Sequence, residues 1–151
     1  MESYGKLADT IQYCNREWLR NFRLDNAIEE GDSDSIVAAV RILTRSPGFP
    51  CQHINFGLLM KYLLQKSDPD SLDALAKLYW YGAGPGSKLV TQNKEKGLAW
   101  YKSAHNRYQA ETGKSSVHLE RKINKKRALI NQAKHLQETE ALRKKFPSIL
   151  F

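Results

Sequence analysis

The sequence has few of the residues that interrupt helices. Five prolines and nine glycines occur among its 151 residues, gathered at a few points, which favours long helices with short joints over a many-turned β fold. No stretch approaches the roughly 20 apolar residues of a membrane span, and the first residues turn polar before an apolar signal segment could form. We therefore expect one all-α domain over residues 1–151 in the cytoplasm, with no membrane partner. Signal-independent secretion into another cell stays open.

Groups that do chemistry are scarce as well. Cys14 and Cys51 form no CxxC pair and lie in apolar helical stretches, which favours buried reduced thiols over the alternative of one disulfide. The four histidines belong to no HExxH motif. The glycine-rich segment 82–88 lacks the spacing of a phosphate loop. We expect that the chain is not an enzyme and that it has no catalytic residue, metal, cofactor or small-molecule substrate.

Apolar periodicity and capping residues predict where the helices lie. Apolar residues recur every three or four positions from Leu7 to Phe22, which predicts an amphipathic helix over residues 5–22. Asp68-Pro69 is a helix start signal, and Asn93 can cap the helix that follows it. The other expected helices are a short turn over 26–30 ending at Gly31, a helix from Asp32 or Ser33 to the Ser46–Pro50 stop, a core helix over 51–66, a helix ending at Tyr81, a helix that breaks at 112–116, and a last helix over 116–145 with Leu119, Ile123, Ile130 and Ala133 inward.

Two consecutive segments carry a family resemblance. Residues 75–84 read Leu-Ala-Lys-Leu-Tyr-Trp-Tyr-Gly-Ala-Gly, and residues 90–105 read Val-Thr-Gln-Asn-Lys-Glu-Lys-Gly-Leu-Ala-Trp-Tyr-Lys-Ser-Ala-His. Together, residues 71–105 resemble one Sel1-like repeat, a helix-turn-helix relative of the tetratricopeptide unit. The family pattern is Leu-Gly-x-Leu-Tyr-x-x-Gly-x-Gly, then Val-x-x-Asp-x-x-Lys-Ala-x-x-Trp-Tyr-x-Lys-Ala-Ala. The chain departs from it by the extra residues 85–89 and by Asn93 in place of Asp.

The resemblance implies an architecture and a kind of function. One unit cannot bury its own faces, so it needs neighbours; the implied fold is antiparallel helical hairpins stacked as a short right-handed solenoid. Its parts would be N-terminal helices (5–67), the Sel1-like unit (68–109), a long basic helix (115–146) and an apolar tail (147–151) that docks on the core or binds a partner. Small residues at Ala76, Gly97 and Ala104 would let the unit's helices approach closely. Sel1-like proteins generally serve as adaptors, in bacteria often in signalling, secretion or host interaction.

Positive charge is concentrated at the C-terminal end. Residues 94–151 hold 14 Lys and Arg against 5 Asp and Glu, whereas residues 1–93 hold 10 against 11. The basic run at 121–127 predicts binding of an acidic protein partner, and inhibition or neutralisation of that partner, as by a regulator or immunity protein, is one form this would take. The alternatives are nucleic acid and a merely solvated face. Trp80 and Tyr81 either face a partner or pack against the preceding helix. The candidate partner-binding residues are Trp80, Tyr81, Lys88, Lys102, Arg107, Arg121, Lys122, Lys125, Lys126 and Arg127.

Overall fold

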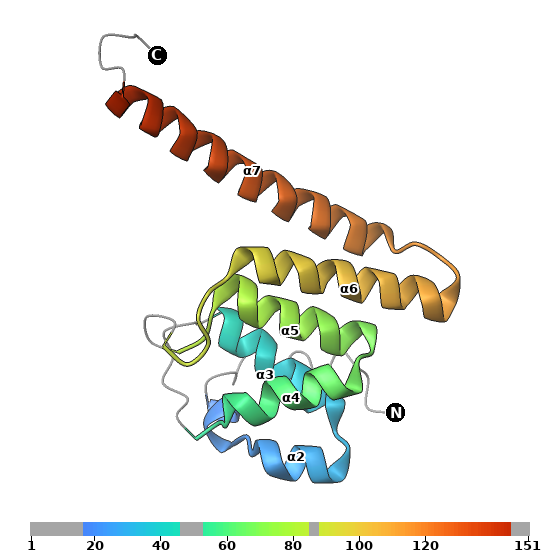
Figure 1. Cartoon of the computed structure of the whole chain (residues 1–151). Helices are drawn as coiled ribbons and strands as arrows, with labels where there is room; N and C mark the ends of the chain where they lie inside the picture. The colour runs from blue at the N-terminus through green and yellow to red at the C-terminus, as the bar shows by residue number, and fades with distance from the viewer. Residues whose placement is uncertain (1–16, 46–52, 85–87, 146–151) are drawn as a thin grey trace.

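The computed structural model describes residues 17–45, 53–84 and 88–145, and within them the chain is all-helical, as expected (Figure 1). One isolated antiparallel bridge joins Ala83 and Val90. No helix in these ranges is long and apolar enough to cross a membrane. The helices are α2 (Leu24–Glu30), α3 (Ser33–Arg45), α4 (Phe56–Lys66), α5 (Pro69–Tyr81), α6 (Lys94–Thr112) and α7 (Val117–Lys145).

Side-chain caps and left-handed glycines fix several helix ends. The Asp68 carboxylate accepts a hydrogen bond from the Ser71 backbone N–H at 2.7 Å, and Pro69 is the first residue of α5. The Asn93 side chain accepts from the Lys96 N–H at 3.0 Å and starts α6. Gly31 ends α2 with a φ of +69°, a conformation open to glycine at little cost. These predicted boundaries are confirmed.

The expectation for the helix at 51–66 is partly wrong. α4 begins only at Phe56, because the Asn55 side chain accepts the Leu58 N–H at 3.0 Å and so caps the helix there. His53 lies in a turn, where its Nε2 is 2.9 Å from the Leu19 carbonyl oxygen. Leu64 is 48% exposed, so α4 covers the core from one side and is not its centre.

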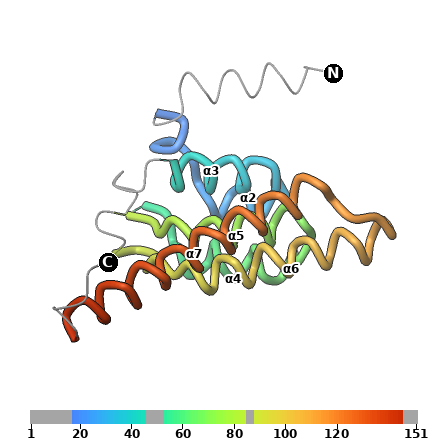
Figure 2. Tube along the Cα trace, turned by 90° about the horizontal axis from the view of Figure 1, so that it is seen from above, coloured from blue at the N-terminus to red at the C-terminus, as the bar shows by residue number. Residues whose placement is uncertain are grey.

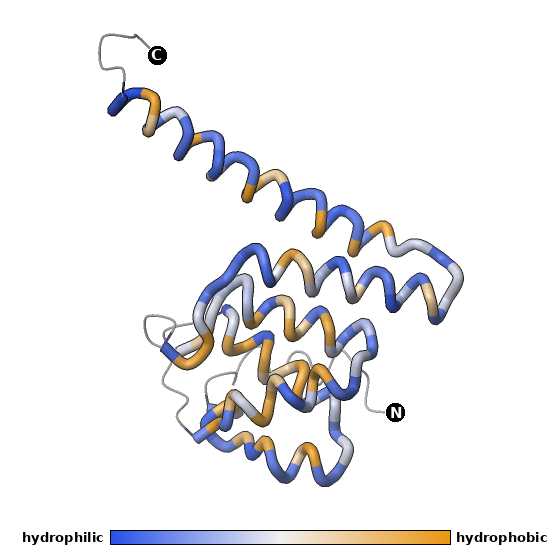
Figure 3. The backbone as a smooth tube through the Cα atoms, in the orientation of Figure 1, coloured by the Kyte–Doolittle hydropathy of each residue, from blue (hydrophilic) through white to orange (hydrophobic). Residues whose placement is uncertain are grey.

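The centre of the fold is α5, which contacts α3, α4 and α6. Apolar residues are dense in α3, α4 and α5 and sparser in α6 and α7 (Figure 3). The larger cluster of buried side chains comes from α2 to α5 and the segments beside them, and Trp100 of α6 packs against it. Its fully buried side chains include Leu19, Ile36, Val40, Leu43, Leu59, Leu63 and Leu78.

The helices α5 and α6 form a tightly packed hairpin. A Cβ added at Gly97 would lie 2.9 Å from the Trp80 backbone nitrogen, closer than real Cβ atoms approach, so only glycine fits at this contact. Ala76 and Ala104 are fully buried at the same hairpin, with Tyr101 between the helices. The close approach predicted from the small residues is confirmed.

Several sequence-based predictions fall wholly or partly outside the described residues. Of the helix expected over residues 5–22, the structure describes a helical stretch at 17–21. The Trp18 ring of this stretch stacks on Phe22, which follows it, with centroids 5.1 Å apart. Cys14, Cys51, the stop at 46–50 and the apolar tail 147–151 are not described.

The last helix packs over only part of its length. Leu119 and Ile123 are buried and Ile130 is half-buried, as predicted, but Ala133 is exposed. The prediction for Ala133 was wrong because α7 diverges from α6 toward its C-terminal end and extends past the rest of the fold (Figures 1 and 2). Continuous helical periodicity does not reveal where the underlying surface ends.

Candidate functional site

The structure divides the ten candidate residues into an exposed and an internal group. Trp80 is buried, and Lys122 and Lys126 are half-buried. The exposed group is Tyr81, Lys88, Lys102, Arg107, Arg121, Lys125 and Arg127.

Trp80 is not available to a partner. Only 4% of it is exposed, and it packs in a small cluster with Ala76, Tyr101 and Ile123, under α7. Its carbonyl oxygen accepts a hydrogen bond from the Gln92 side chain at 2.9 Å. The prediction of Trp80 as a partner-binding residue was wrong because α7, which follows it by some forty residues, covers it.

Lys126 of α7 is enclosed by aromatic rings. Its Nζ lies 4.4 Å from the ring centroid of Trp80, 5.0 Å from that of Tyr101 and 5.2 Å from that of Tyr81, all within the range of cation–π attraction. Burial, followed by the nearby positive charge of Lys122, lowers the pKa of Lys126 to about 8. These three rings, the aromatic cage, hold Lys126 against the hairpin and withdraw it from a partner.

Lys122, one turn earlier, is held by a carboxylate. Its Nζ donates to Asp73 at 2.9 Å, and Lys77 contacts the other Asp73 oxygen at 3.0 Å. Burial alone would raise the pKa of Asp73, but the charges and hydrogen bonds of the two lysines hold it below its ordinary value of 3.8. Lys122 and Lys126 therefore fasten α7 to α5. Sequence reasoning missed this because Asp73 and Lys122 are 49 residues apart and no local pattern links them.

One outer face of α7 combines charge with apolar side chains. Arg121, Lys125, Leu129 and Leu136 follow one another at intervals of four, four and seven residues, which places them along one side of the helix. Leu129 is 49% exposed and Leu136 62%. Within the described part of the chain, neither Arg121 nor Lys125 forms an ion pair. We call these four residues the basic–apolar stripe.

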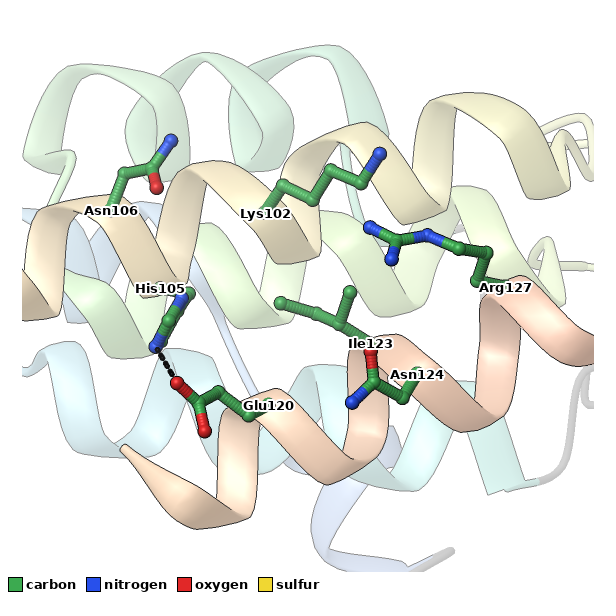
Figure 4. Close-up of a pocket in the computed structure, with 7 residues that line it drawn as sticks. All are labelled: Lys102, His105, Asn106, Glu120, Ile123, Asn124 and Arg127. Atoms are coloured by element: carbon green, nitrogen blue, oxygen red, sulfur yellow. Dashed lines mark ion pairs between the residues drawn. The ribbon is translucent and has the colours of Figure 1, made fainter. Parts of the chain in front are cut away.

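A polar cleft lies between α6 and α7 (Figure 4). Its volume is about 380 Å³. The Nε2 of His105 is buried there without a hydrogen bond from any described residue, since the nearest Glu120 oxygen is 3.7 Å away. We call it the α6–α7 cleft; it is lined by Lys102, His105, Asn106, Glu120, Ile123, Asn124 and Arg127.

The remaining exposed candidates contribute less. Arg107 pairs with Glu111 one turn later in α6 at 3.1 Å, so its charge is largely balanced locally. Lys88 lies in the loop before α6. Among the described residues, no group of three or more His, Cys, Asp or Glu side chains could hold a metal ion.

Comparison with known proteins adds no relative. No protein-family model matches the chain, and neither a curated protein nor a solved structure matches it.

Proposed function

We propose that this chain is a non-enzymatic protein-binding module that docks an acidic partner on the basic–apolar stripe of α7. The observation that carries the proposal is that two cations and two exposed leucines lie on the same face of α7. The cations, Arg121 and Lys125, form no ion pair with any described residue. Acidic side chains would meet the cations, while apolar side chains would cover Leu129 and Leu136.

The leucines favour protein over nucleic acid as the partner. Protein interfaces bury apolar groups at their centre within a polar rim, whereas binding to phosphates gains nothing from exposed leucines on the same helix face. Single-stranded nucleic acid would also use aromatic side chains for stacking, and Trp80 is sealed under α7. Lys122 pairs with Asp73 and Lys126 lies against the Trp80 ring, so α7 offers fewer positive charges to a polyanion than its sequence suggests.

The proposal includes the scaffold. The hairpin α5–α6 would be one Sel1-like unit, with the helices before it and α7 after it as degenerate neighbours in a short right-handed solenoid. The tight contact at Gly97 and the burial of Ala76 and Ala104 support this reading. An adaptor, or a regulator that inhibits or neutralises its partner in the cytoplasm, is the role that such a scaffold would serve.

The test is a pull-down with charge-reversed and matched control variants. Tagged wild-type chain is incubated with native lysate, half of it nuclease-treated. We expect a discrete acidic protein to be retained in both halves and lost with R121E/K125E and with L129S/L136S. The control K61E/L64S changes a comparable pair on α4, where Lys61 is exposed and Leu64 is 48% exposed, and should retain the protein.

Two outcomes would contradict the proposal. Loss of all retained material after nuclease treatment would assign α7 to nucleic acid, and binding should then fall steeply with salt, by roughly one log unit per phosphate contact per log of salt concentration. Equal retention by the stripe variants and by wild type would place the interface elsewhere.

A further inference from the structure

The α6–α7 cleft faces away from the basic–apolar stripe. Arg127 follows Lys125 by two positions, which at 3.6 residues per turn is about 200° around the helix axis. Arg127 lines the cleft, and Lys125 does not. The cleft is therefore a second surface, which does not depend on the function proposed for the stripe.

Two positive side chains meet in this cleft without a balancing partner. Lys102 comes from α6 and Arg127 from α7, and the Arg127 side chain extends toward the side where Lys102 lies (Figure 4). Neither forms an ion pair with a described residue. Like charges that converge on one cleft repel each other, and an anion between them reverses that cost.

Other polar groups of the cleft add hydrogen-bonding capacity. Asn106 and Asn124 each carry a side-chain NH₂, and His105 brings an Nε2 that lacks a hydrogen-bond partner among the described residues. The one acid of the lining, Glu120, lies beside His105 (Figure 4). Its charge repels an anion and so favours placement near Lys102 and Arg127.

We propose that the α6–α7 cleft binds a phosphate monoester, with the phosphoryl group between Lys102 and Arg127. A phosphoryl dianion balances both cations, and its three oxygens can accept from the guanidinium, which suits bidentate contacts, from the ammonium and from the amides. A carboxylate offers one charge and two oxygens. The volume of about 380 Å³ is within the range of small-molecule sites and leaves room for the organic part of the ester.

The test is calorimetric titration of the full chain at low ionic strength with phosphoserine, inorganic phosphate and acetate. We expect saturable binding of one phosphoserine per chain and no saturable binding of acetate. Inorganic phosphate distinguishes the two sources: weaker binding than phosphoserine identifies an ester site, and equal binding identifies a site for free phosphate and overturns the ester assignment.

Matched variants locate the site. K102Q and R127Q should each weaken phosphoserine binding about tenfold or more, as expected for loss of a hydrogen bond to a charged group. K125Q and R121Q remove the same charges from the stripe and should change affinity less than about twofold, because the high dielectric constant of water weakens the effect of distant exposed charges. E120Q should tighten binding. Equal losses in all four cation variants, or the absence of saturation, would overturn the proposal.

Discussion

The Nζ of Lys126 lies 4.4 Å from the centre of the Trp80 ring, and this contact joins the basic run to the end of α5. One turn earlier in α7, Lys122 donates a hydrogen bond to Asp73 of α5. A lysine-rich segment that looks solvent-facing in sequence therefore has a structural side and an outer side. The outer side, with Arg121 and Lys125, is the one that a partner can reach.

We predict that the half-buried charge of Lys126 makes stability depend on pH in the alkaline range. Its pKa is about 8 in the folded chain, against an ordinary value of 10.5, so between these values the unfolded chain holds the proton more strongly than the folded one. The free energy of unfolding should therefore rise as pH increases from about 8. The contribution of Lys126 to this slope is at most about 1.4 kcal/mol per pH unit, the limit for one proton, and solvent screening of the half-buried group reduces it further. Urea denaturation at about pH 7.5 and about pH 9.5 measures the slope.

The variant K126M should remove that part of the slope. Burial also lowers the pKa of Lys77, which acts in the same direction, so the comparison between variants is decisive. K61M takes one charge from an exposed position of α4 and should keep the wild-type slope. A slope identical in wild type and K126M would contradict the prediction.

We predict that Asp73→Asn destabilises the fold by about 1–3 kcal/mol, because it leaves Lys77 and Lys122 partly buried without their carboxylate. The pKa of Asp73 is held below 3.8, so its stabilising contribution is present above that value and is lost as pH falls through the lower folded pKa. Urea denaturation at neutral pH and in acid checks both parts. Glu138→Gln, at an exposed position of α7, should change stability by less than about 0.5 kcal/mol. An unchanged free energy of unfolding in Asp73→Asn would show that the two lysine–aspartate pairs contribute nothing to stability.

We predict opposite effects for two glycine-to-alanine substitutions. Gly97→Ala should destabilise by about 1–3 kcal/mol, because the new Cβ would lie 2.9 Å from the Trp80 backbone nitrogen and would force α5 and α6 apart. Gly57→Ala in α4 meets only the Asn55 side chain at 3.4 Å and should be neutral or stabilising by up to about 1 kcal/mol. Thermal unfolding of both variants gives the answer. Similar effects at the two positions would mean that the hairpin is looser than described.

We predict that the two halves of α7 differ in energetic importance. Ile123→Ala should cost about 2–4 kcal/mol, since Ile123 is 6% exposed in the cluster with Trp80 and Tyr101. Leu136→Ala should cost less than about 0.5 kcal/mol in the free chain because Leu136 is 62% exposed. Hydrogen exchange should follow the same division, with fast exchange beyond residue 131. Strong protection there in the isolated chain would contradict the description of α7.

Local chemistry made much of the fold predictable. Asp68, Pro69 and Asn93 act on backbone groups within three residues of themselves, so the starts of α5 and α6 follow from sequence alone. The start of α4 failed because the apolar residues before Phe56 suggested a longer helix, whereas the Asn55 cap determined its first turn. Competition between a cap and an apolar pattern is difficult to judge from sequence.

The candidate site was less predictable because its organisation is tertiary. Whether Trp80 is a surface anchor depends on α7 crossing it, and whether Lys126 is free depends on three rings from two other helices. Residue types and spacing located the run of basic residues on one helix. They did not show which of its basic side chains face inward, because the helix is charged on more than one side.

The half of α7 beyond Ile130 has mechanical significance. At 1.5 Å per residue, it projects roughly 20 Å past its last half-buried apolar contact. A partner bound at its tip would act through this lever arm on the aromatic cage and on Asp73. A force at the far end of α7 would produce a torque there. Tension on the complex would thus be felt first at the seam between α7 and the hairpin, and the rest of the core would be shielded from it.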